Sequence, residues 1–340
     1  MVKMGFAQAI ESAITKAMEE DEQVIIMGED VHGLRLNLFV RFGKERVMST
    51  PISESAFVGS AVTASMLGLR PIVEIMLVDF VGVTMDAILN HAAKISFFSG
   101  DKWNVPIVIR TACGGGYGDA GQHEQSLWGW LAHIPGLNIV VPSNPADAGG
   151  LMLSSIYADN PVIYFEHKLL ADYWLDSMGS GGRTTVSFDV PDNGLVGEVP
   201  DTWKPIPLGK LNRVIEGNDI TLVSVGVGVH RALDAAIALE KEKSISAEVL
   251  DLRCLAPLDV EGLRNSVEKT GALLIIDEDY KKFGLSGEIC ASLLENELSF
   301  KFGRVCTEST IPYSRDLEYQ VLPNTKRIVD KALRILKMLK

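Results

Sequence analysis

The feature that most constrains this chain is a regular alternation of short apolar runs with helical stretches. Residues 6–20 carry apolar side chains at helical spacing, and residues 24–27 form a short apolar run that ends at Gly28-Glu29-Asp30. The same alternation recurs at residues 55–69 and 71–77. Buried strands separated by helices are typical of parallel sheets that are covered on both faces. We therefore expect an α/β fold.

The alternation runs through most of the chain, with one interruption. Further strands are predicted over residues 106–111, 138–141 and 162–166, and a helix over 85–97. Residues 171–209 are rich in Gly, Ser, Asp, Pro and Trp and show no period, which indicates a linker and surface excursion.

The pattern restarts in the second half of the chain. Strands are predicted over residues 220–229, 247–251 and 272–277, and helices over 230–240, 260–269 and 285–298. At roughly 150 residues per domain, a chain of 340 residues has room for two. We expect two doubly wound domains, residues 1–190 and 216–340, joined by a linker over 191–215.

Charge and motif content argue against several classes of function. The chain has 32 Lys and Arg against 44 Asp and Glu, a net charge of −12, and no long basic run, so binding to nucleic acid or to an anionic membrane is not expected. Apolar runs of about 18 residues are absent and the N-terminus has no targeting leader, so we expect a cytoplasmic protein. Gly226-Val227-Gly228 lacks the third glycine of a dinucleotide-binding loop and predicts a tight turn instead.

His123 and Glu54 are the candidate functional residues. His123 follows the glycine-rich segment Gly114-Gly115-Gly116, which comes after a predicted strand, and ligands bind beyond the carboxyl ends of parallel strands. The alternative is a hydrogen-bonded loop or core histidine. Glu54 lies between Pro51 and a predicted helix start, where it either points into a crevice or stabilises the helix terminus. The residues alone leave these alternatives open.

Short motifs spread over nearly the whole chain resemble those of one protein family. They are MGEDV (27–31), TPISE (50–54), GLRP (68–71), NHAAK (90–94), QH (122–123), HIPGL (133–137), VPS (141–143), DNP (159–161), PLGK (207–210), DLR (251–253) and APLD (256–259). In this order and spacing the chain resembles the β subunit of the thiamine diphosphate-dependent decarboxylase component of 2-oxoacid dehydrogenase complexes, including its acetoin-cleaving relatives.

The resemblance implies a transketolase-like pyrimidine-binding domain followed by a transketolase C-terminal-like domain. It also implies an α2β2 heterotetramer with thiamine diphosphate at the interface between the chains. In this family the α subunit holds the diphosphate through magnesium with a Gly-Asp-Gly motif, which this chain lacks. We therefore expect no magnesium site here, no activity of the chain alone, and transfer of the acyl group to lipoyl on an acyltransferase core.

The same resemblance assigns roles to four residues. Glu54 matches the carboxyl group that hydrogen-bonds N1′ of the aminopyrimidine, which allows the cofactor to become its own base. Phe80 and Met76 match positions that line the pyrimidine pocket, with core packing as the alternative for both. His123 matches the histidine that faces substrate and lipoyl arm. The expected catalytic residues are Glu54 and His123, and all four are expected to contact the cofactor.

Three departures from the family pattern, and a fourth at the implied cation site, are present. Leu77-Val78 replaces an aromatic-containing stretch that is common before the Asp79-Phe80 pair, which leaves the pocket shape and substrate preference open. Glu124 replaces the usual Ser and is expected to add a negative charge beside His123. Ala158 replaces a common Asp in a segment that, with Ile107, Ser155 and Asn160, is implied to hold a structural monovalent cation. The stretch over residues 171–205 is longer than usual.

The sequence leaves the substrate open. Pyruvate is our first expectation, and branched-chain 2-oxoacids and acetoin use the same type of subunit, so an acetoin dehydrogenase β subunit is the alternative. One methylene in an apolar pocket discriminates by only about 1–3 kcal/mol. The C-terminal half of a split transketolase and an inactive scaffold subunit are the remaining hypotheses.

Overall fold

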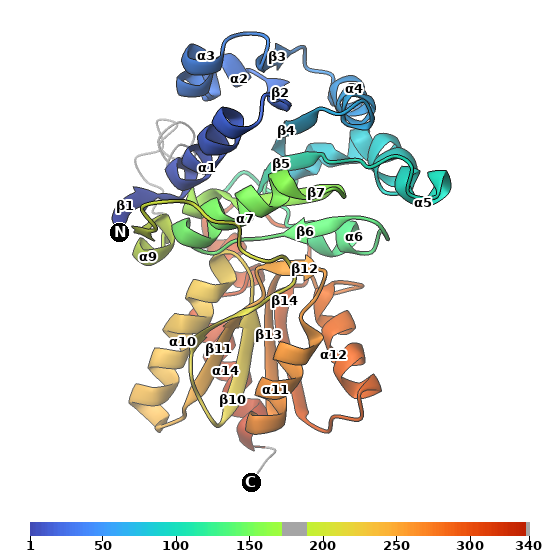
Figure 1. Cartoon of the computed structure of the whole chain (residues 1–340). Helices are drawn as coiled ribbons and strands as arrows, with labels where there is room; N and C mark the ends of the chain where they lie inside the picture. Colours follow the sequence, from blue (N-terminus) through green and yellow to red (C-terminus); the bar gives the residue numbers. More distant parts are fainter. Residues whose placement is uncertain (172–188, 338–340) are drawn as a thin grey trace.

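The computed structural model describes residues 1–171 and 189–337. Two large sheets lie one above the other in Figure 1. In spatial order, the strands of the first are β12 (Cys254–Ala256), β6 (Asn138–Val140), β7 (Val162–His167), β5 (Val108–Cys113), β4 (Arg70–Leu77), β2 (Val24–Glu29) and β3 (Val47–Thr50). Those of the second are β14 (Lys301–Thr307), β13 (Ala272–Tyr280), β10 (Ile220–Ser224), β11 (Ala247–Asp251) and β9 (Asn212–Ile215).

Both large sheets are parallel except for one antiparallel edge strand each. These strands are β12, which pairs with β6, and β9, which pairs with β11. A separate two-stranded antiparallel sheet joins β1 (Val2–Gly5) to β8 (Val196–Val199). The predicted α/β class with mostly parallel sheets is confirmed.

Helices cover both faces of each large sheet. On the first sheet, α1 (Phe6–Glu20) and α7 (Pro145–Tyr157) cover one face. The other face is covered by α4 (Glu54–Met66), the 3₁₀ helix η1 (Val78–Thr84), the π-helix η2 (Asp86–Ala92) and α6 (Trp128–Ala132). On the second sheet, α10 (Val227–Lys243) and α14 (Thr325–Lys337) lie opposite α11 (Val260–Thr270) and α12 (Leu285–Glu295). The remaining helices are short: α2 (Val31–Leu34), α3 (Leu36–Phe42), α5 (Ile95–Ser99), η3 (Lys168–Leu170), α9 (Asp192–Leu195) and α13 (Arg315–Val321).

Strand β4 shows why these strands are apolar runs rather than alternating ones. Ile72 and Leu77 pack in the core beneath α1 and α7, whereas Val73 and Ile75 pack in the core beneath α4. Successive side chains of a strand point to opposite faces, apart from the irregularity in β4 between Ile75 and Leu77, so a strand covered on both faces is apolar at most positions. Glu74 is the exception in β4, and it is buried against two guanidinium groups. The run that predicts a strand in the sequence therefore also predicts that it is buried on both sides.

The two sheets share one hydrophobic core. Ile109 of β5 and Trp128 of α6 belong to the same buried cluster as Val223 of β10 and Ile275 of β13. Strand β12 follows β11 in the chain but pairs with β6 of the first sheet (Figure 1). The two halves therefore pack as one body, and the domain limits given above stay a prediction.

Three local expectations differ from the structure. The helix predicted over residues 85–97 is broken between η2 and α5, where Gly136 approaches so closely that a Cβ would lie 2.1 Å from the Ala93 carbonyl oxygen. Helix α10 begins at Val227 rather than at residue 230, because the chain turns at Gly226, whose φ is +52°. The third difference concerns the segment over residues 171–209.

That segment is only partly what the sequence predicts. Residues 172–188 lie outside the described part of the chain. Beyond them, β8 pairs with β1, and the buried indole of Trp203 donates a hydrogen bond to Ser12 Oγ on α1 at 2.9 Å. This portion packs onto the first half rather than forming only a surface excursion.

A row of buried charges crosses the first sheet. Arg35 Nε and Arg110 Nη1 both donate to Glu74 Oε1 at 2.8 Å, and Arg110 Nε donates to Glu166 Oε2 at 2.9 Å. All four side chains are buried, and the two guanidinium groups hold the pKa of Glu74 below its usual value although burial acts in the opposite direction. Each buried carboxylate of the row is compensated by the guanidinium groups beside it, so removing one of these groups would leave a buried charge unpaired.

The first prediction concerns Arg110, which joins the two carboxylates of this row. Replacing it in Arg110→Met leaves two buried carboxylates undercompensated and should lower the free energy of unfolding by about 3–5 kcal/mol. Lys241→Met, on the exposed surface of α10, is the control and should stay within about 0.5 kcal/mol. Urea unfolding of the purified chain measures both, and a loss below about 1 kcal/mol for Arg110→Met would contradict the assignment.

Candidate functional site

The four residues expected to form the site lie along one edge of the first sheet. Because β3, β2, β4 and β5 are parallel neighbours, their carboxyl ends meet at the same edge, where open α/β sheets bind ligands. Glu54 follows β3, Met76 lies near the end of β4, Phe80 lies in η1 directly after β4, and His123 lies in the loop after β5. The fold thus brings together segments that the sequence separates widely.

Glu54 is the first residue of α4 and is partly exposed. Ser53, not Glu54, is the N-cap residue, and its side chain makes no capping hydrogen bond. The pKa of Glu29, at the end of β2, is raised mainly by burial. The negative charges of Asp30 and Glu54 raise it further. Glu54 therefore lies close enough to the end of β2 to act on Glu29, while its position also suits the helix N-terminus.

The start of α4 is tied to η1, and η1 is tied to the loop of His123. Ser55 Oγ donates to the Val83 carbonyl oxygen at 2.5 Å. Gln125 Nε2 donates to Asp79 Oδ1 at 2.7 Å. These two hydrogen bonds fix the residues on either side of Phe80 to the segments that carry Glu54 and His123.

Phe80 and His123 are in direct contact. Their ring centroids lie 6.0 Å apart with an interplanar angle of 89°, an edge-to-face arrangement. Phe80 and Met76 are partly buried and pack against the core, so the packing alternative holds for part of each side chain. Both side chains also keep part of their surface exposed.

Two buried polar atoms at this edge lack a partner. Thr50 Oγ1, at the end of β3, and Asp79 Oδ2, next to Phe80, have no hydrogen-bond partner among the described residues. Buried polar groups are normally satisfied. A polar ligand or partner chain covering this edge fits both atoms.

The glycine-rich loop after β5 is held by three glutamates. The N–H groups of Gly115, Gly116 and Tyr117 donate to carboxylate oxygens of Glu278 at 2.8 Å, Glu318 at 2.5 Å and Glu124 at 2.6 Å, respectively. Glu278 lies in β13 and Glu318 in α13, so two of the three acceptors belong to the second half of the chain. The sequence analysis missed both residues, and no local signal marks them.

The loop has little room for other residue types at its start. Gly114 has a φ of +96°, and a Cβ there would lie 2.0 Å from Nε2 of His167. That nitrogen donates to Glu278 Oε1 at 2.9 Å, because Nδ1 of the same ring accepts from the Leu169 N–H. Glycine at position 114 is therefore required by backbone conformation and by close approach.

The expectation that Glu124 adds a negative charge beside His123 is wrong. Its side chain is fully buried, and burial together with the neighbouring Glu318 carboxyl group raises the pKa of Glu124 to about 9. Glu124 Oε2 has no donor among the described residues, whereas Glu318 already accepts from Gly116 and Arg315. Two carboxyl groups meet here without repulsion only if one of them, Glu124, carries a proton at neutral pH.

Lys168 supports the other side of the loop. Its ammonium group donates to the His123 carbonyl oxygen at 2.7 Å and lies 4.7 Å from the centre of the Tyr117 ring. Lys168 is 1% exposed, and burial lowers the pKa of its ammonium group while nearby acidic groups, Asp119 and Asp79 among them, oppose this change. The backbone of His123 is thus bound to a buried cation that comes from the end of β7.

The segment expected to bind a monovalent cation lies elsewhere. The Ile107 carbonyl oxygen accepts from the Val162 N–H at 2.9 Å, and the Ala158 carbonyl oxygen accepts from Arg70 at 3.2 Å. Ser155 is buried and its hydroxyl donates to the Leu151 carbonyl oxygen. These carbonyl groups already have partners, and the cation stays a prediction.

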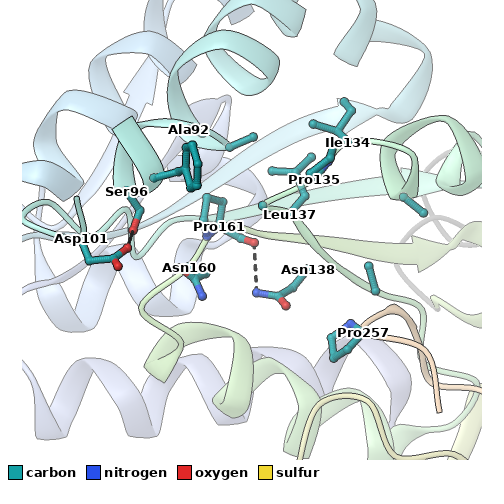
Figure 2. A pocket seen from close by; sticks show the side chains of 15 residues that line it. Ala92, Ser96, Asp101, Ile134, Pro135, Leu137, Asn138, Asn160, Pro161 and Pro257 are labelled. Atoms are coloured by element: carbon teal, nitrogen blue, oxygen red, sulfur yellow. Dashed lines mark hydrogen bonds between the residues drawn. The ribbon is translucent and has the colours of Figure 1, made fainter. Parts of the chain in front are cut away.

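A separate cavity of about 480 Å³ borders this segment (Figure 2). Its wall includes Asn160 and Pro161, before β7, and Asn138, at the start of β6, so it lies at the amino ends of the strands. Among the described residues that line it, Asp101 is the single ionisable one, and Asp101 accepts a hydrogen bond from Ser96 Oγ. The cavity lacks the converging acid and base groups that chemistry requires, and the carboxyl edge remains the candidate site.

The part of the chain that the structure describes shows neither a cluster of metal ligands nor a membrane-spanning helix. Residues 1–171 and 189–337 contain no group of three or more His, Cys, Asp or Glu side chains arranged to hold a metal ion. No helix in those ranges is long and apolar enough to cross a membrane.

The second prediction follows from the buried proton on Glu124. The folded chain keeps this proton up to about pH 9, whereas the unfolded chain releases it near pH 4.5. Between these pH values the folded state binds more protons than the unfolded state, so the free energy of unfolding falls as pH rises. The decrease is at most about 1.4 kcal/mol per pH unit. Glu124→Gln, which mimics the protonated acid, should lack this slope. Urea unfolding at several pH values compares the two chains, and parallel pH profiles would show that Glu124 is ionised in the folded state.

Comparison with known proteins agrees with this geometry. Residues 2–172 match the family described as "Transketolase, pyrimidine binding domain", and residues 209–328 match "Transketolase, C-terminal domain". A split-gene transketolase, described as an inactive beta4 tetramer, has a similar structure, with a TM-score of 0.79 and 20% identity over 99% of both chains. At this identity the likeness shows the fold alone.

Sequence relatives narrow the family further. The chain is 39% identical to the β subunit of acetoin:2,6-dichlorophenolindophenol oxidoreductase from Bacillus subtilis, covering 98% of this chain and 97% of the relative. It is 36% identical to the pyruvate dehydrogenase E1 component subunit β from Staphylococcus epidermidis, covering 98% of both chains. The chain belongs to the family of β subunits of thiamine diphosphate-dependent 2-oxoacid and acetoin dehydrogenases.

Proposed function

We propose that this chain supplies the pyrimidine side of a thiamine diphosphate site that cleaves acetoin with release of acetaldehyde and passes the remaining two-carbon unit, oxidised to an acyl group, to a lipoyl disulfide, which is reduced. The observation that carries the proposal is the placement of Glu54, Phe80 and His123 along one edge of the sheet. A 2-oxoacid, with pyruvate first, is the second candidate substrate.

Glu54 is the acidic group of this proposal. When bound, thiamine diphosphate supplies a nucleophilic carbon and an electron sink for cleaving the bond next to a ketone carbonyl. The Glu54 carboxyl would hold a proton at N1′ of the pyrimidine, the role for which a half-buried carboxyl group at the sheet edge is suited. Thr50 Oγ1 and Asp79 Oδ2, which lack partners, would be satisfied at the same edge.

Phe80 and His123 form the other wall. Phe80 would pack against the pyrimidine ring, and its edge-to-face contact with His123 orients the imidazole toward the same space. His123 would donate a hydrogen bond or a proton to the substrate oxygen as charge develops there. Met76 would line the pocket beside them, next to the core beneath α1.

An α subunit would complete the site. Ile52 and Val83 flank Glu54 and Ser55 and are 74% and 61% exposed, although both side chains are apolar. Exposed apolar residues around a functional edge are typical of a surface that a partner covers. In the proposed α2β2 heterotetramer the α chain would hold the diphosphate and its magnesium ion, and the acyltransferase core would present the lipoyl group, whose disulfide accepts two electrons.

The order of the relatives supports acetoin over pyruvate. The acetoin:2,6-dichlorophenolindophenol oxidoreductase β subunit from B. subtilis is 39% identical, against 36% for the pyruvate dehydrogenase subunit from S. epidermidis, at equal coverage of this chain. Our first expectation from the sequence, pyruvate, does not agree with this order of sequence identities. Either substrate would use the same Glu54 and His123.

The third prediction tests Glu54. In the complex reconstituted with its α chain, Glu54→Gln should lower kcat by about 10²–10⁴-fold, because an amide cannot share a proton with N1′. Glu45→Gln, an exposed neighbour before β3, is the matched control and should leave kcat unchanged. Dye reduction with saturating substrate and cofactor measures both variants. Wild-type turnover by Glu54→Gln, with intact folding by circular dichroism, would refute the assigned role.

The fourth prediction concerns substrate and partner. With the α chain present, reduction of 2,6-dichlorophenolindophenol should proceed with kcat/KM at least about tenfold higher for acetoin than for pyruvate, a difference of about 1.4 kcal/mol in transition-state binding. The β chain alone should reduce no dye with either substrate. A higher kcat/KM for pyruvate would replace acetoin by the second candidate.

A further inference from the structure

The glycine-rich loop after β5 is a nest of backbone N–H groups filled by the protein's own carboxylates. Successive amides of this kind form anion-binding concavities in other proteins. Here Glu278, Glu318 and Glu124 accept the three N–H groups of residues 115–117, so the loop is not available to cradle a phosphate. Instead, these three hydrogen bonds fix the path of the chain between β5 and His123.

The contact with Glu318 crosses the junction between the two halves of the chain. Glu318 is fully buried in α13, accepts from the Gly116 N–H and from Arg315, and faces the protonated carboxyl group of Glu124. Glu124 directly follows His123 in the chain. A displacement of α13 would therefore be transmitted to the residue next to the candidate catalytic histidine.

Lys168 acts on His123 itself. Its ammonium group donates to the His123 carbonyl oxygen at 2.7 Å, and its own carbonyl oxygen accepts from the Tyr117 hydroxyl at 3.0 Å. The ammonium group is also within the electrostatic influence of Glu124, Asp119 and Asp79. A buried lysine that donates a hydrogen bond to a backbone carbonyl holds that residue's backbone in place. The directions available to the side chain of the same residue, here His123, are therefore restricted.

We propose that Lys168 and Glu318 are positioning residues for His123, and that through Glu318 the second half of the chain holds the imidazole at the orientation the reaction requires. The inference rests on the proposed function in one respect, since the orientation matters for turnover only if His123 faces the substrate. The geometry of the clamp itself does not depend on that function.

A purely structural role predicts something different. If the clamp contributed only to folding stability, its loss would lower the melting temperature but leave kcat and the reactivity of His123 in the folded complex unchanged. A positioning role predicts a lower kcat with a smaller change in KM, because orientation is needed in the transition state more than for substrate binding. It also predicts that the His123 imidazole becomes more reactive toward a small reagent once the loop is released.

The fifth prediction uses the full chain in complex with its α subunit. Lys168→Met should lower kcat for acetoin by about ten- to a hundredfold and raise the rate of His123 modification by diethyl pyrocarbonate several-fold, measured by mass spectrometry. His91, which is exposed on η2, is the internal reference and should not change. Lys168→Arg, which keeps the charge and the donor, should restore most of both properties, and Lys241→Met is the matched control on α10.

Glu318→Gln provides a second arm if Lys168→Met fails to fold. The amide has the shape of the acid but offers the Gly116 N–H a weaker acceptor and breaks the ion pair with Arg315. His123 modification should therefore rise and kcat should fall, although position 318 lies outside the first sheet. Glu308→Gln, a surface carboxylate paired with Lys281, is its control.

The outcomes separate this inference from the proposed function. Unchanged kcat and unchanged His123 modification in a folded Lys168→Met or Glu318→Gln complex overturn the inference, and so does a loss of kcat that Lys168→Arg does not rescue. If the wild-type complex turns over neither acetoin nor a 2-oxoacid, the proposed function fails, and the modification rates alone still decide whether the clamp positions His123.

Discussion

The site depends on the buried contacts that join the loop after β5 to glutamates in the second half of the chain. Burying a carboxylate is costly unless its oxygens are paired. Glu278 accepts from the Gly115 N–H and from His167, and these contacts hold the pKa of Glu278 below its usual value despite burial. Glu124 is instead accommodated by keeping its proton. Each buried carboxyl group of the loop is therefore either paired with hydrogen-bond donors, as in Glu278, or protonated, as in Glu124. These pairings fix the loop that leads to His123.

The two walls of the site differ in how completely the chain itself forms them. On the His123 side, Lys168 and Glu124 are buried and bonded, so the loop has a defined path before any ligand arrives. On the Glu54 side, the helix start is partly exposed and Ile52 is largely exposed. A rigid wall positions chemical groups, whereas an open wall suits a surface completed by a partner. This division agrees with the family of β subunits to which the chain belongs.

Under the proposed function, the same edge would serve more than one substrate, because the residues given roles there would not contact the part in which the substrates differ. Acetoin and pyruvate share a ketone carbon bonded to a methyl group and differ in the group that leaves. Glu54 would act on the cofactor and His123 on the substrate oxygen, so neither distinguishes the two. Discrimination then falls to pocket-lining residues such as Met76 and to the partner chain, and the energy available there is small.

The sequence by itself determined the periodic elements and the identity of the candidate residues. The helix over Phe6–Glu20 and the strand over Ala247–Asp251 begin and end where the apolar pattern predicts, because that pattern is a local property of the chain. Tertiary structure alone decided the contacts of the glycine loop with Glu278 and Glu318, which lie 163 and 202 residues away along the chain. It also reversed the expected charge of Glu124, because ionisation depends on burial and on neighbours that only folding brings into contact.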